Sequence, residues 1–385
     1  MPDSISLVHY MGTYLNKSET FIGRFVNQST AWGRAVVIAE KFNHLPNISL
    51  DNETLTRYQI PQFNYSRGSV IGFGRYIRER IQGANKHTLF LKAYLDVLKP
   101  SIVHCHFGRL GIRYAKACQS SNLDIPFVVS FYGYDATKLP QKDLQYKKEL
   151  ALIFEQAAGV FVEGPQLKNE VTALGANPDK VLINPLLIPV SEYPEKTNWY
   201  QNGRPCTFLC AGRFVEKKGF HLFFEAIGKI QDELPDFNIE VIGEGPMRGK
   251  YEEVIEKHGL SNHIEFLGWK SYPDLLQHIK KADFFVHPSV VSSDGDSEGG
   301  APTILLEAQA IKTPVIASRH ADIPYVMGYD DFLCKEGDIE SLRSVILNAV
   351  NSNDLLSLAE EGYYKVLCQH NISSDIYRKN IESVL

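Results

Sequence analysis

The chain has 385 residues, more than one hydrophobic core usually organises, so we expect two domains. It has no run of eighteen apolar residues and no charged leader that ends in a small-residue cleavage site. These features predict a cytoplasmic protein without a membrane span. The six cysteines have no zinc-like spacing, which favours ordinary thiols over a metal site.

Charge is distributed unevenly along the chain. Residues 1–190 contain 21 Lys and Arg against 15 Asp and Glu, whereas residues 191–385 contain 19 against 30, so the net charge of −5 combines +6 with −11. Residues 67–99 place basic side chains among aromatic and aliphatic ones. Either a solvated helix face or a basic amphipathic surface in peripheral contact with an anionic membrane accounts for this pattern. No nucleic-acid-binding motif accompanies it, so we do not expect nucleic acid as a partner.

Short β-branched and aromatic runs alternate with helical patterns, as in parallel sheets built from βα units. In the first half we predict strands at Ile5–Val8, Val36–Ile38, Ile102–His104, Phe127–Phe131, Val160–Val162 and Val181–Ile183. In the second half we predict strands at Thr207–Ala211, Ile239–Ile242, Ile264–Leu267, Phe284–His287, Val315–Ala317 and Phe332–Cys334. The sequence therefore predicts an α/β protein with two doubly wound parallel sheets.

A proline-containing stretch without periodicity separates the two sets of strands. We therefore expect an N-terminal domain at residues 1–188, a linker at 189–205 and a second domain at 206–370. Loops that leave the carboxyl ends of parallel strands build the ligand sites of such sheets. Functional residues are therefore expected in these loops.

The loop after the predicted strand Thr207–Ala211 contains two cations, Arg213 and Lys218. A guanidinium and an ammonium that converge on one diphosphate would stabilise the charge that develops as a sugar–phosphate bond breaks. A surface turn with solvated charges is the alternative. Of these two interpretations, the diphosphate site is favoured by a second segment some eighty residues further along the chain.

In that second segment, Pro302 suits the first turn of a helix, so the backbone N–H groups of Thr303 and Ile304 are expected to be open to an anion. Glu307 lies one turn beyond Thr303, where its carboxylate could accept hydrogen bonds from two ribose hydroxyls. Glu298, in the preceding Gly-rich turn, would face the sugar of the same ligand. The alternative for Glu298 is a simple place in an acidic loop.

Two further motifs are interpreted as structural. Asp294 and Asp296 imitate a metal-binding Asp-x-Asp pair, but they lie beside Glu298 and far from any first-sheet strand end. The run Gly243–Gly249 imitates a dinucleotide loop, but its third glycine is displaced, which favours a tight turn. We expect neither a metal nor another cofactor.

These motifs together resemble the retaining family-4 glycosyltransferases, which have the GT-B fold. The resemblance spans nearly the whole chain and includes Gly212-Arg213…Lys218-Gly219, Ile242 to Arg248, Phe266 to Trp269, Ala282 to Ser289 and the segment ending Glu307 to Ala310. The run Ser18 to Ile22 is similar to members that build bacterial capsule and exopolysaccharide repeats, of the colanic-acid type.

The resemblance implies two Rossmann-like domains that face each other across a deep cleft, with a C-terminal helix in 371–385 that packs back on the first domain. It implies that Arg213 and Lys218 bind the donor diphosphate, that Glu298 contacts the transferred sugar and that Glu307 binds the ribose. Further contacts would come from Thr303, Ile304, Gly12 and Trp269. The implied reaction moves a sugar from a UDP- or GDP-sugar to a saccharide or lipid-linked hydroxyl, with retention and without metal.

The sequence departs from the family pattern at two places. Eight residues rather than seven separate Glu298 from Glu307, and a bulged Gly-Gly turn could absorb the extra one. Tyr132 stands where the family's His-Gly-x-Asp motif has its histidine, while Asp135 is retained. These departures leave two alternatives open: a nucleotide-sugar epimerase or hydrolase of the same fold, and a catalytically silent donor-binding subunit.

A histidine pair, His104 and His106, ends the predicted strand Ile102–His104. It could supply an acceptor-side base or hydrogen bond. A metal pair is the weaker interpretation because the sequence shows no third ligand at a suitable spacing. With Tyr132 and Asp135, His106 completes the expected acceptor side.

Overall fold

The computed structural model describes residues 5–15, 20–43, 56–60, 87–121, 123–201 and 204–385. Contacts divide the chain into two compact units. Unit 1 comprises the described residues within Met1–Val162, Glu170–Asn184 and Asp375–Leu385, and unit 2 comprises those within Glu163–Asn169 and Pro185–Ser374. Among the described helices, none has the length and apolar character needed to cross a bilayer.

Unit 1 is built on a seven-stranded parallel sheet. In chain order its strands are β1 Leu7–Tyr14, β2 Ala35–Phe42, β3 Thr56–Gln59, β4 Ile102–His106, β5 Phe127–Ser130, β6 Gly159–Val162 and β7 Val181–Ile183. Their spatial order is β3-β2-β1-β4-β5-β6-β7. The direction of the strand order therefore reverses between β1 and β4, and side chains at the carboxyl ends of these two strands are brought together.

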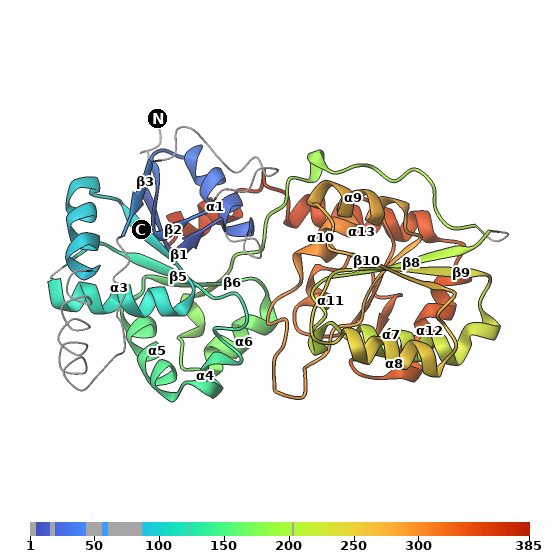
Figure 1. Cartoon of the computed structure of the whole chain (residues 1–385). Helices are drawn as coiled ribbons and strands as arrows, with labels where there is room; N and C mark the ends of the chain where they lie inside the picture. The colour runs from blue at the N-terminus through green and yellow to red at the C-terminus, as the bar shows by residue number, and fades with distance from the viewer. Residues whose placement is uncertain (1–4, 16–19, 44–55, 61–86, 122, 202–203) are drawn as a thin grey trace. The chain divides into compact units, whose positions relative to one another are not determined.

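Helices cover the sheet of unit 1 on both faces (Figure 1). They are α1 Thr20–Thr30, α3 Gly108–Ser121, α4 Leu139–Lys142, α5 Leu144–Gln156, α6 Pro165–Ala173, whose first residues are grouped with unit 2, and α14 Ile376–Glu382. Asp143 caps α5 by accepting a hydrogen bond from the Tyr146 N–H. The C-terminal residues complete unit 1, since the Tyr377 hydroxyl of α14 lies 2.7 Å from Nδ1 of His104.

Unit 2 has a six-stranded parallel sheet with strands β8 Cys206–Ala211, β9 Phe237–Ile242, β10 Ile264–Gly268, β11 Phe284–His287, β12 Val315–Ser318 and β13 Leu333–Cys334. The spatial order is β10-β9-β8-β11-β12-β13, the doubly wound Rossmann-like order. Its core contains stacked aromatic side chains, among them Phe208 and Phe284, whose ring centroids are 5.6 Å apart.

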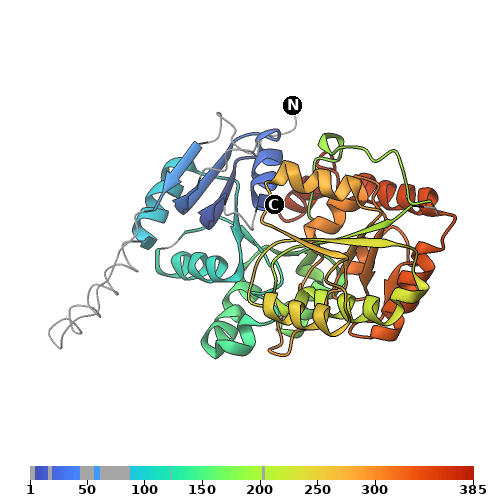
Figure 2. The same cartoon turned by 45° about the vertical axis from the view of Figure 1, so that its right-hand side comes forward.

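Two helical layers enclose this sheet, as Figures 1 and 2 show. Helices α7 Phe220–Ile230, α8 Arg248–Lys257 and α12 Ile339–Val350 lie on one face, and α9 Tyr272–Lys281, α10 Thr303–Ala310 and α13 Leu355–Gln369 lie on the other, with the short α11 Ile323–Val326 after β12. Short 3-10 turns occupy Pro178–Lys180, Val190–Glu192, Glu216–Lys218 and Gln231–Glu233.

The predicted fold class is confirmed, because both halves contain the expected parallel sheets. Each of the twelve predicted strands is present, although β1 begins two residues later than predicted and continues to Tyr14. The sequence did not indicate β3, whose residues Thr56–Gln59 are mostly exposed and lack an apolar pattern. Strand β3 is held by its pairing with β2 rather than by burial.

Gly219, at the start of α7, has a left-handed backbone with φ of 67°, and a Cβ there would lie 1.9 Å from the Pro288 carbonyl oxygen. We expect Gly219→Ala to destabilise the protein by roughly 2–4 kcal/mol, from the backbone cost together with overpacking. Gly249→Ala is the matched control, since nothing lies within 4 Å of a Cβ in that turn of α8. The control should be neutral or slightly stabilising. Equal melting temperatures for the two variants would contradict this account.

Candidate functional site

The loops after β8 and β11 meet at the point where the strand order of unit 2 reverses. Strands β8 and β11 are neighbours, with Phe284 opposite Phe208 and Phe285 opposite Leu209. Ligands of open parallel sheets bind at this position, outside the carboxyl ends of the strands. The loop after β8 carries the predicted cations, and the loop after β11 carries Glu298.

Lys218 and Glu298 form an ion pair at this reversal point. Their Nζ and Oε1 atoms are 2.8 Å apart, and the side chains expose 11% and 8% of their surfaces. Ser289 donates its hydroxyl to the same carboxylate at 3.1 Å, and Lys217 Nζ lies 3.9 Å from the other oxygen. Lys217 also donates to the Ser297 carbonyl at 2.8 Å, which ties the two loops together next to the carboxylate.

The surroundings keep this pair ionised. Burial would raise the pKa of Glu298, but Lys218, followed by His287 and Lys217, holds that pKa well below its ordinary value. Burial lowers the pKa of Lys218, and the Glu298 carboxylate opposes that shift. Burial and then Lys218 lower the pKa of His287 to about 4, so this imidazole is neutral at physiological pH. Its Nδ1 is buried with no hydrogen-bond partner among the described residues.

Arg213 differs from Lys218 because its side chain is exposed. It forms no ion pair with any described residue, although its charge contributes to the lowered pKa of Lys218. Three cations, Arg213, Lys217 and Lys218, therefore lie at this strand end, and Arg213 alone among them has no carboxylate partner among the described residues. The positive charge left over at Arg213 attracts an anionic ligand.

The helix after Glu298 begins where the sequence predicted. Pro302 is the N-cap of α10, and no described backbone carbonyl accepts a hydrogen bond from Thr303 or Ile304. Glu307 is 6% exposed, and one of its carboxylate oxygens accepts the Tyr272 hydroxyl at 2.8 Å. Gly299, with φ of 80°, makes a left-handed turn between Glu298 and the helix, in the Gly-Gly segment that the sequence predicted to be bulged.

The other predicted features of unit 2 also have clear positions. Trp269 follows β10 and exposes 65% of its surface. A Cβ at Gly243 would lie 1.9 Å from the Gly212 carbonyl oxygen, so this glycine permits a close approach of two backbones, in agreement with a tight turn. Asp294 and Asp296 lie in a turn closed by the Ser292 hydroxyl, which donates to Asp294 and accepts from the Asp296 N–H.

In unit 1, three histidines gather at the reversal point between β1 and β4. His9, His104 and His106 are fully buried, and one ring nitrogen from each lies within 4.8 Å of the others. The sequence analysis missed His9 because it precedes the pair by almost a hundred residues. The signal was available in the topology, since β1 and β4 pair with His9 directly opposite His104.

The hydrogen bonds of this cluster determine where its protons lie. Ser29 donates its hydroxyl to the Val26 carbonyl at 2.7 Å, so His9 Nε2, 2.9 Å away, must donate to Ser29. His9 Nδ1 then accepts from Nε2 of His106 at 3.0 Å, and Nδ1 of His106 accepts the Tyr132 hydroxyl at 2.7 Å.

Metal ligation would require this arrangement to change. The rings of His104 and His106 stack with centroids 4.1 Å apart and planes 28° apart, so their in-plane lone pairs do not converge on one point. Both ring nitrogens of His104 already lie 2.7 Å from hydroxyls, those of Ser130 and Tyr377. The geometry therefore suits a hydrogen-bonded core better than a metal centre.

The predicted acceptor-side residues belong to unit 1. Asp135 is 4% exposed, and its carboxylate accepts the backbone N–H groups of Tyr132 and Gly108, so it holds the loop after β5 against the start of α3. Gly12, in β1, and Asp135 line a hollow of about 300 Å³. The described residues thus place Gly12, His106, Tyr132 and Asp135 in unit 1, and Arg213, Lys218, Trp269, Glu298, Thr303, Ile304 and Glu307 in unit 2.

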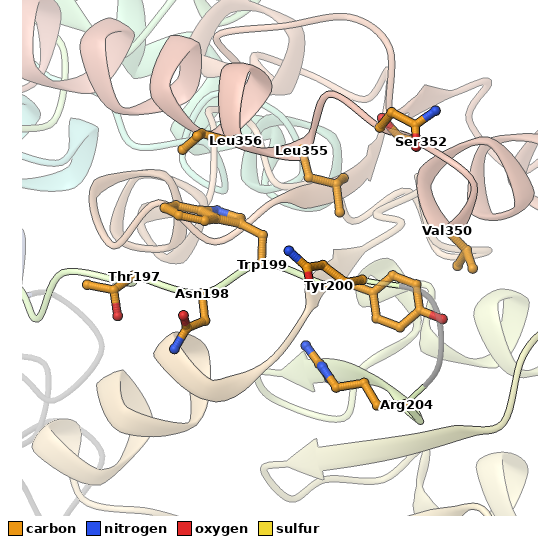
Figure 3. A pocket seen from close by; sticks show the side chains of 11 residues that line it. Thr197, Asn198, Trp199, Tyr200, Arg204, Val350, Ser352, Leu355 and Leu356 are labelled. Carbon is orange, nitrogen blue, oxygen red and sulfur yellow. The ribbon is translucent and has the colours of Figure 1, made fainter.

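A larger pocket, of about 980 Å³, lies elsewhere in unit 2, between residues 197–201 with Arg204 on one side and the segment joining α12 to α13 on the other (Figure 3). Its cation, Arg204, makes two hydrogen bonds to the carboxylate of Asp283, which is 1% exposed. The charge of Arg204 is therefore neutralised within the fold. This pocket lacks the unbalanced cations of the strand-end cluster.

Comparison with known proteins shows a similarity to one family over most of unit 2. Residues 193–364 match the family model of group 1 glycosyl transferases. The amylovoran biosynthesis glycosyltransferase AmsK of Erwinia amylovora is 26% identical over 343 residues, which cover 85% of this chain and 81% of that protein. The putative colanic acid biosynthesis glycosyltransferase WcaL of Escherichia coli is 23% identical over 79% of this chain and 75% of its own.

Solved structures share the fold at low sequence identity. The apo form of the lipopolysaccharide outer core galactosyltransferase WaaB has a TM-score of 0.71 over 99% of both chains, at 16% identity. Anabaena Alr3699/HepE in complex with UDP and glucose has a TM-score of 0.71 over 99% of both chains, at 12% identity. These likenesses show the two-domain GT-B architecture.

The buried histidines generate an expectation about acid stability. Burial lowers the pKa of His9 to about 3 and of His287 to about 4, and lowers the pKa values of His104 and His106 well below the ordinary 6.5. In the unfolded chain these rings titrate near pH 6.5, so the unfolded state binds more protons below that pH. Stability should therefore fall as the pH decreases from about 6.5, by about 1.4 kcal/mol per pH unit for each ring.

The melting temperature, measured in steps from pH 7.5 to 5.0, checks this expectation. Carboxylates with lowered pKa values, such as that of Glu298, also stabilise the fold. Their contribution is lost only below about pH 4.5, so they do not change the melting temperature in this pH range. A melting temperature that stays constant or rises from pH 6.5 to pH 5.0 would show that the histidines do not stay neutral in the folded protein.

Proposed function

We propose that the chain transfers a sugar from a UDP- or GDP-sugar to a hydroxyl of a saccharide or lipid-linked acceptor, and the match of residues 193–364 to the group 1 glycosyl transferase model supports this. The proposal includes retention of configuration at the anomeric carbon and independence of metal ions. One observation supports it above the others. The nearly buried Lys218–Glu298 pair stands beside the exposed Arg213, directly before the open helix start at Thr303.

The proposal assigns each part of the donor to one group of residues. The diphosphate would lie between Arg213, Lys218 and the N–H groups at the start of α10, where the helix dipole also favours negative charge. The ribose hydroxyls would donate to Glu307, which the Tyr272 hydroxyl already holds in place. Trp269, exposed after β10, would lie near the base.

The chemistry follows from these positions. As the bond between the anomeric carbon and the diphosphate oxygen breaks, its electron pair moves to that oxygen, and the growing charge is stabilised by Arg213 and Lys218. The acceptor oxygen forms the new bond on the same face of the sugar and passes its proton to the departing diphosphate. A strong protein base is therefore not required. Glu298 would orient the sugar and balance the positive charge that develops at its anomeric carbon.

The acceptor side of the proposal rests on unit 1 and on the relatives. Gly12, His106, Tyr132 and Asp135 would line the acceptor site at the ends of β1, β4 and β5. The relatives named for amylovoran and colanic acid biosynthesis support a role in polysaccharide biosynthesis. The proposal places this role at the cytoplasmic face of a membrane. Of the proposed membrane-contact stretch 67–99, residues 67–86 lie outside the described part of the chain.

Removing either cation should slow donor cleavage. We expect Arg213→Ala and Lys218→Ala each to lower the turnover number by about 10²–10³, because each loses a donor aimed at the developing charge. The measurement is the release of the nucleoside diphosphate, UDP or GDP, from UDP-glucose, UDP-galactose and GDP-mannose, with and without EDTA. Lys250→Ala, an exposed change on α8, is the matched control. Loss of activity on chelation would contradict metal independence, and unchanged turnover in both cation variants would contradict the site.

Glu307 should act on affinity rather than on the chemical step. We expect Glu307→Gln to raise the Kd of the favoured nucleotide about tenfold, since a hydrogen bond to a charged group is worth roughly 1.5–3 kcal/mol. Turnover at saturating donor should change little. Calorimetric titration with UDP, GDP and their deoxyribose analogues checks the assignment. The variant should lose the preference for ribose, and an unchanged preference would show that the ribose lies elsewhere.

A further inference from the structure

The backbone of Glu298 is held by two residues that neither the sequence analysis nor the proposed reaction uses. His320 lies just after β12 and is 1% exposed, and Glu336 lies just after β13. The Glu298 N–H donates to Nε2 of His320 at 3.1 Å. On the other side of the ring, Nδ1 lies 3.0 Å from a carboxylate oxygen of Glu336.

The Glu298 contact fixes the proton of the imidazole. A backbone amide can only donate, so Nε2 of His320 must present its lone pair to Glu298. The single proton of the neutral ring is therefore on Nδ1 and is donated to Glu336. The Ser297 hydroxyl, 3.2 Å from Nε2, can donate to the same lone pair, because its oxygen already accepts the Gly299 N–H at 3.1 Å.

Glu336 is itself held by the loop that carries Glu298. Its second carboxylate oxygen accepts the backbone N–H of Val291 at 2.7 Å. The two oxygens of Glu336 are thus directed at Val291 and at His320. Together, His320 and Glu336 attach the loop after β11 at two points, Val291 and Glu298.

We propose that His320 and Glu336 are positioning residues for donor turnover, which they support by fixing the backbone from which the Glu298 carboxylate reaches Lys218. This inference rests on the proposed function, in which Glu298 contacts the sugar. Its physical basis is the direction of the hydrogen bonds. Moving the ring proton to Nε2, or adding a second proton, would place two donors against each other at the Glu298 N–H and release this loop.

A Glu336 side chain that merely fills space would tolerate an isosteric change, whereas one that positions Glu298 would not. Glu336→Gln therefore distinguishes a space-filling role from a positioning role. In that variant the carboxamide oxygen must continue to accept the Val291 N–H, so its NH₂ group faces Nδ1 of His320. Nδ1 must then accept, and the ring proton moves to Nε2, where it opposes the Glu298 N–H. The variant keeps the shape of the side chain and reverses the tautomer.

The first test is the tautomer of His320, measured by the ¹⁵N chemical shifts of its imidazole in full-length protein with labelled histidine. The signal is assigned by its disappearance in His320→Asn. We expect a protonated Nδ1 and a bare Nε2 in the unmodified protein, and the opposite pattern in Glu336→Gln. A bare Nδ1 in the unmodified protein would overturn the proposal.

The second test is donor turnover, followed as nucleotide release from the most active of UDP-glucose, UDP-galactose and GDP-mannose. Glu336→Gln should lower the turnover number about tenfold with little change in the KM for donor, while the melting temperature remains near that of the unmodified protein. Glu256→Gln, an exposed change on α8, is the matched control for loss of one negative charge. Unchanged turnover in Glu336→Gln would overturn the proposal.

A double-variant comparison separates positioning from general damage. In His320→Gln the carboxamide oxygen takes the place of Nε2 as acceptor for the Glu298 N–H, whatever Glu336 does. We therefore expect Glu336→Gln to have little further effect in that background. A second tenfold loss there would show that Glu336 acts by another route.

Glu298→Ala distinguishes this inference from the proposed function on which it rests. If Glu298→Ala abolishes nucleotide release but Glu336→Gln does not reduce it, the positioning role alone is wrong. If Glu298→Ala retains full nucleotide release, the donor-site assignment itself is wrong.

Discussion

The site in unit 2 depends on a nearly buried ion pair between Lys218 and Glu298. Removing two charges from water is costly, and their attraction compensates only when further hydrogen bonds satisfy the remaining atoms. Ser289 provides such a hydrogen bond to the carboxylate, and the Lys217 ammonium, 3.9 Å from its other oxygen, adds a second favourable charge. The Lys218–Glu298 pair is neutral as a whole, and the exposed Arg213 adds a positive charge beside it at the end of β8.

Backbone packing makes this convergence possible. Gly219 lies where the Pro288 carbonyl leaves no room for a Cβ, so the loops after β8 and β11 can approach closely. Gly243 allows a similar approach between the loops after β8 and β9. The chemistry at the strand ends is therefore linked to fold stability, since the same close contacts hold the loops and the charged side chains in place. His320, after β12, and Glu336, after β13, hold the backbone of Glu298 from the other side.

Much of this arrangement could be predicted from the sequence, because strand periodicity and the position of Arg213 and Lys218 after a strand are local signals. The fold class followed from those signals. Strand β3 could not be found, since pairing with β2 rather than an apolar pattern stabilises it. His9 and His320 were missed for a related reason. His106, the partner of His9, is 97 residues away, and the partners of His320 lie in other loops, 22 and 16 residues away, so the order of the strands brings each set together.

A crystal structure of the protein soaked with UDP, and in parallel with GDP, tests the central claim most directly. The account predicts one of these nucleotides with its phosphates between Arg213, Lys218 and the start of α10, and with its ribose hydroxyls on Glu307. A nucleotide bound elsewhere, for example in the pocket lined by Trp199 and Arg204, with the Lys218–Glu298 pair unoccupied, would contradict it.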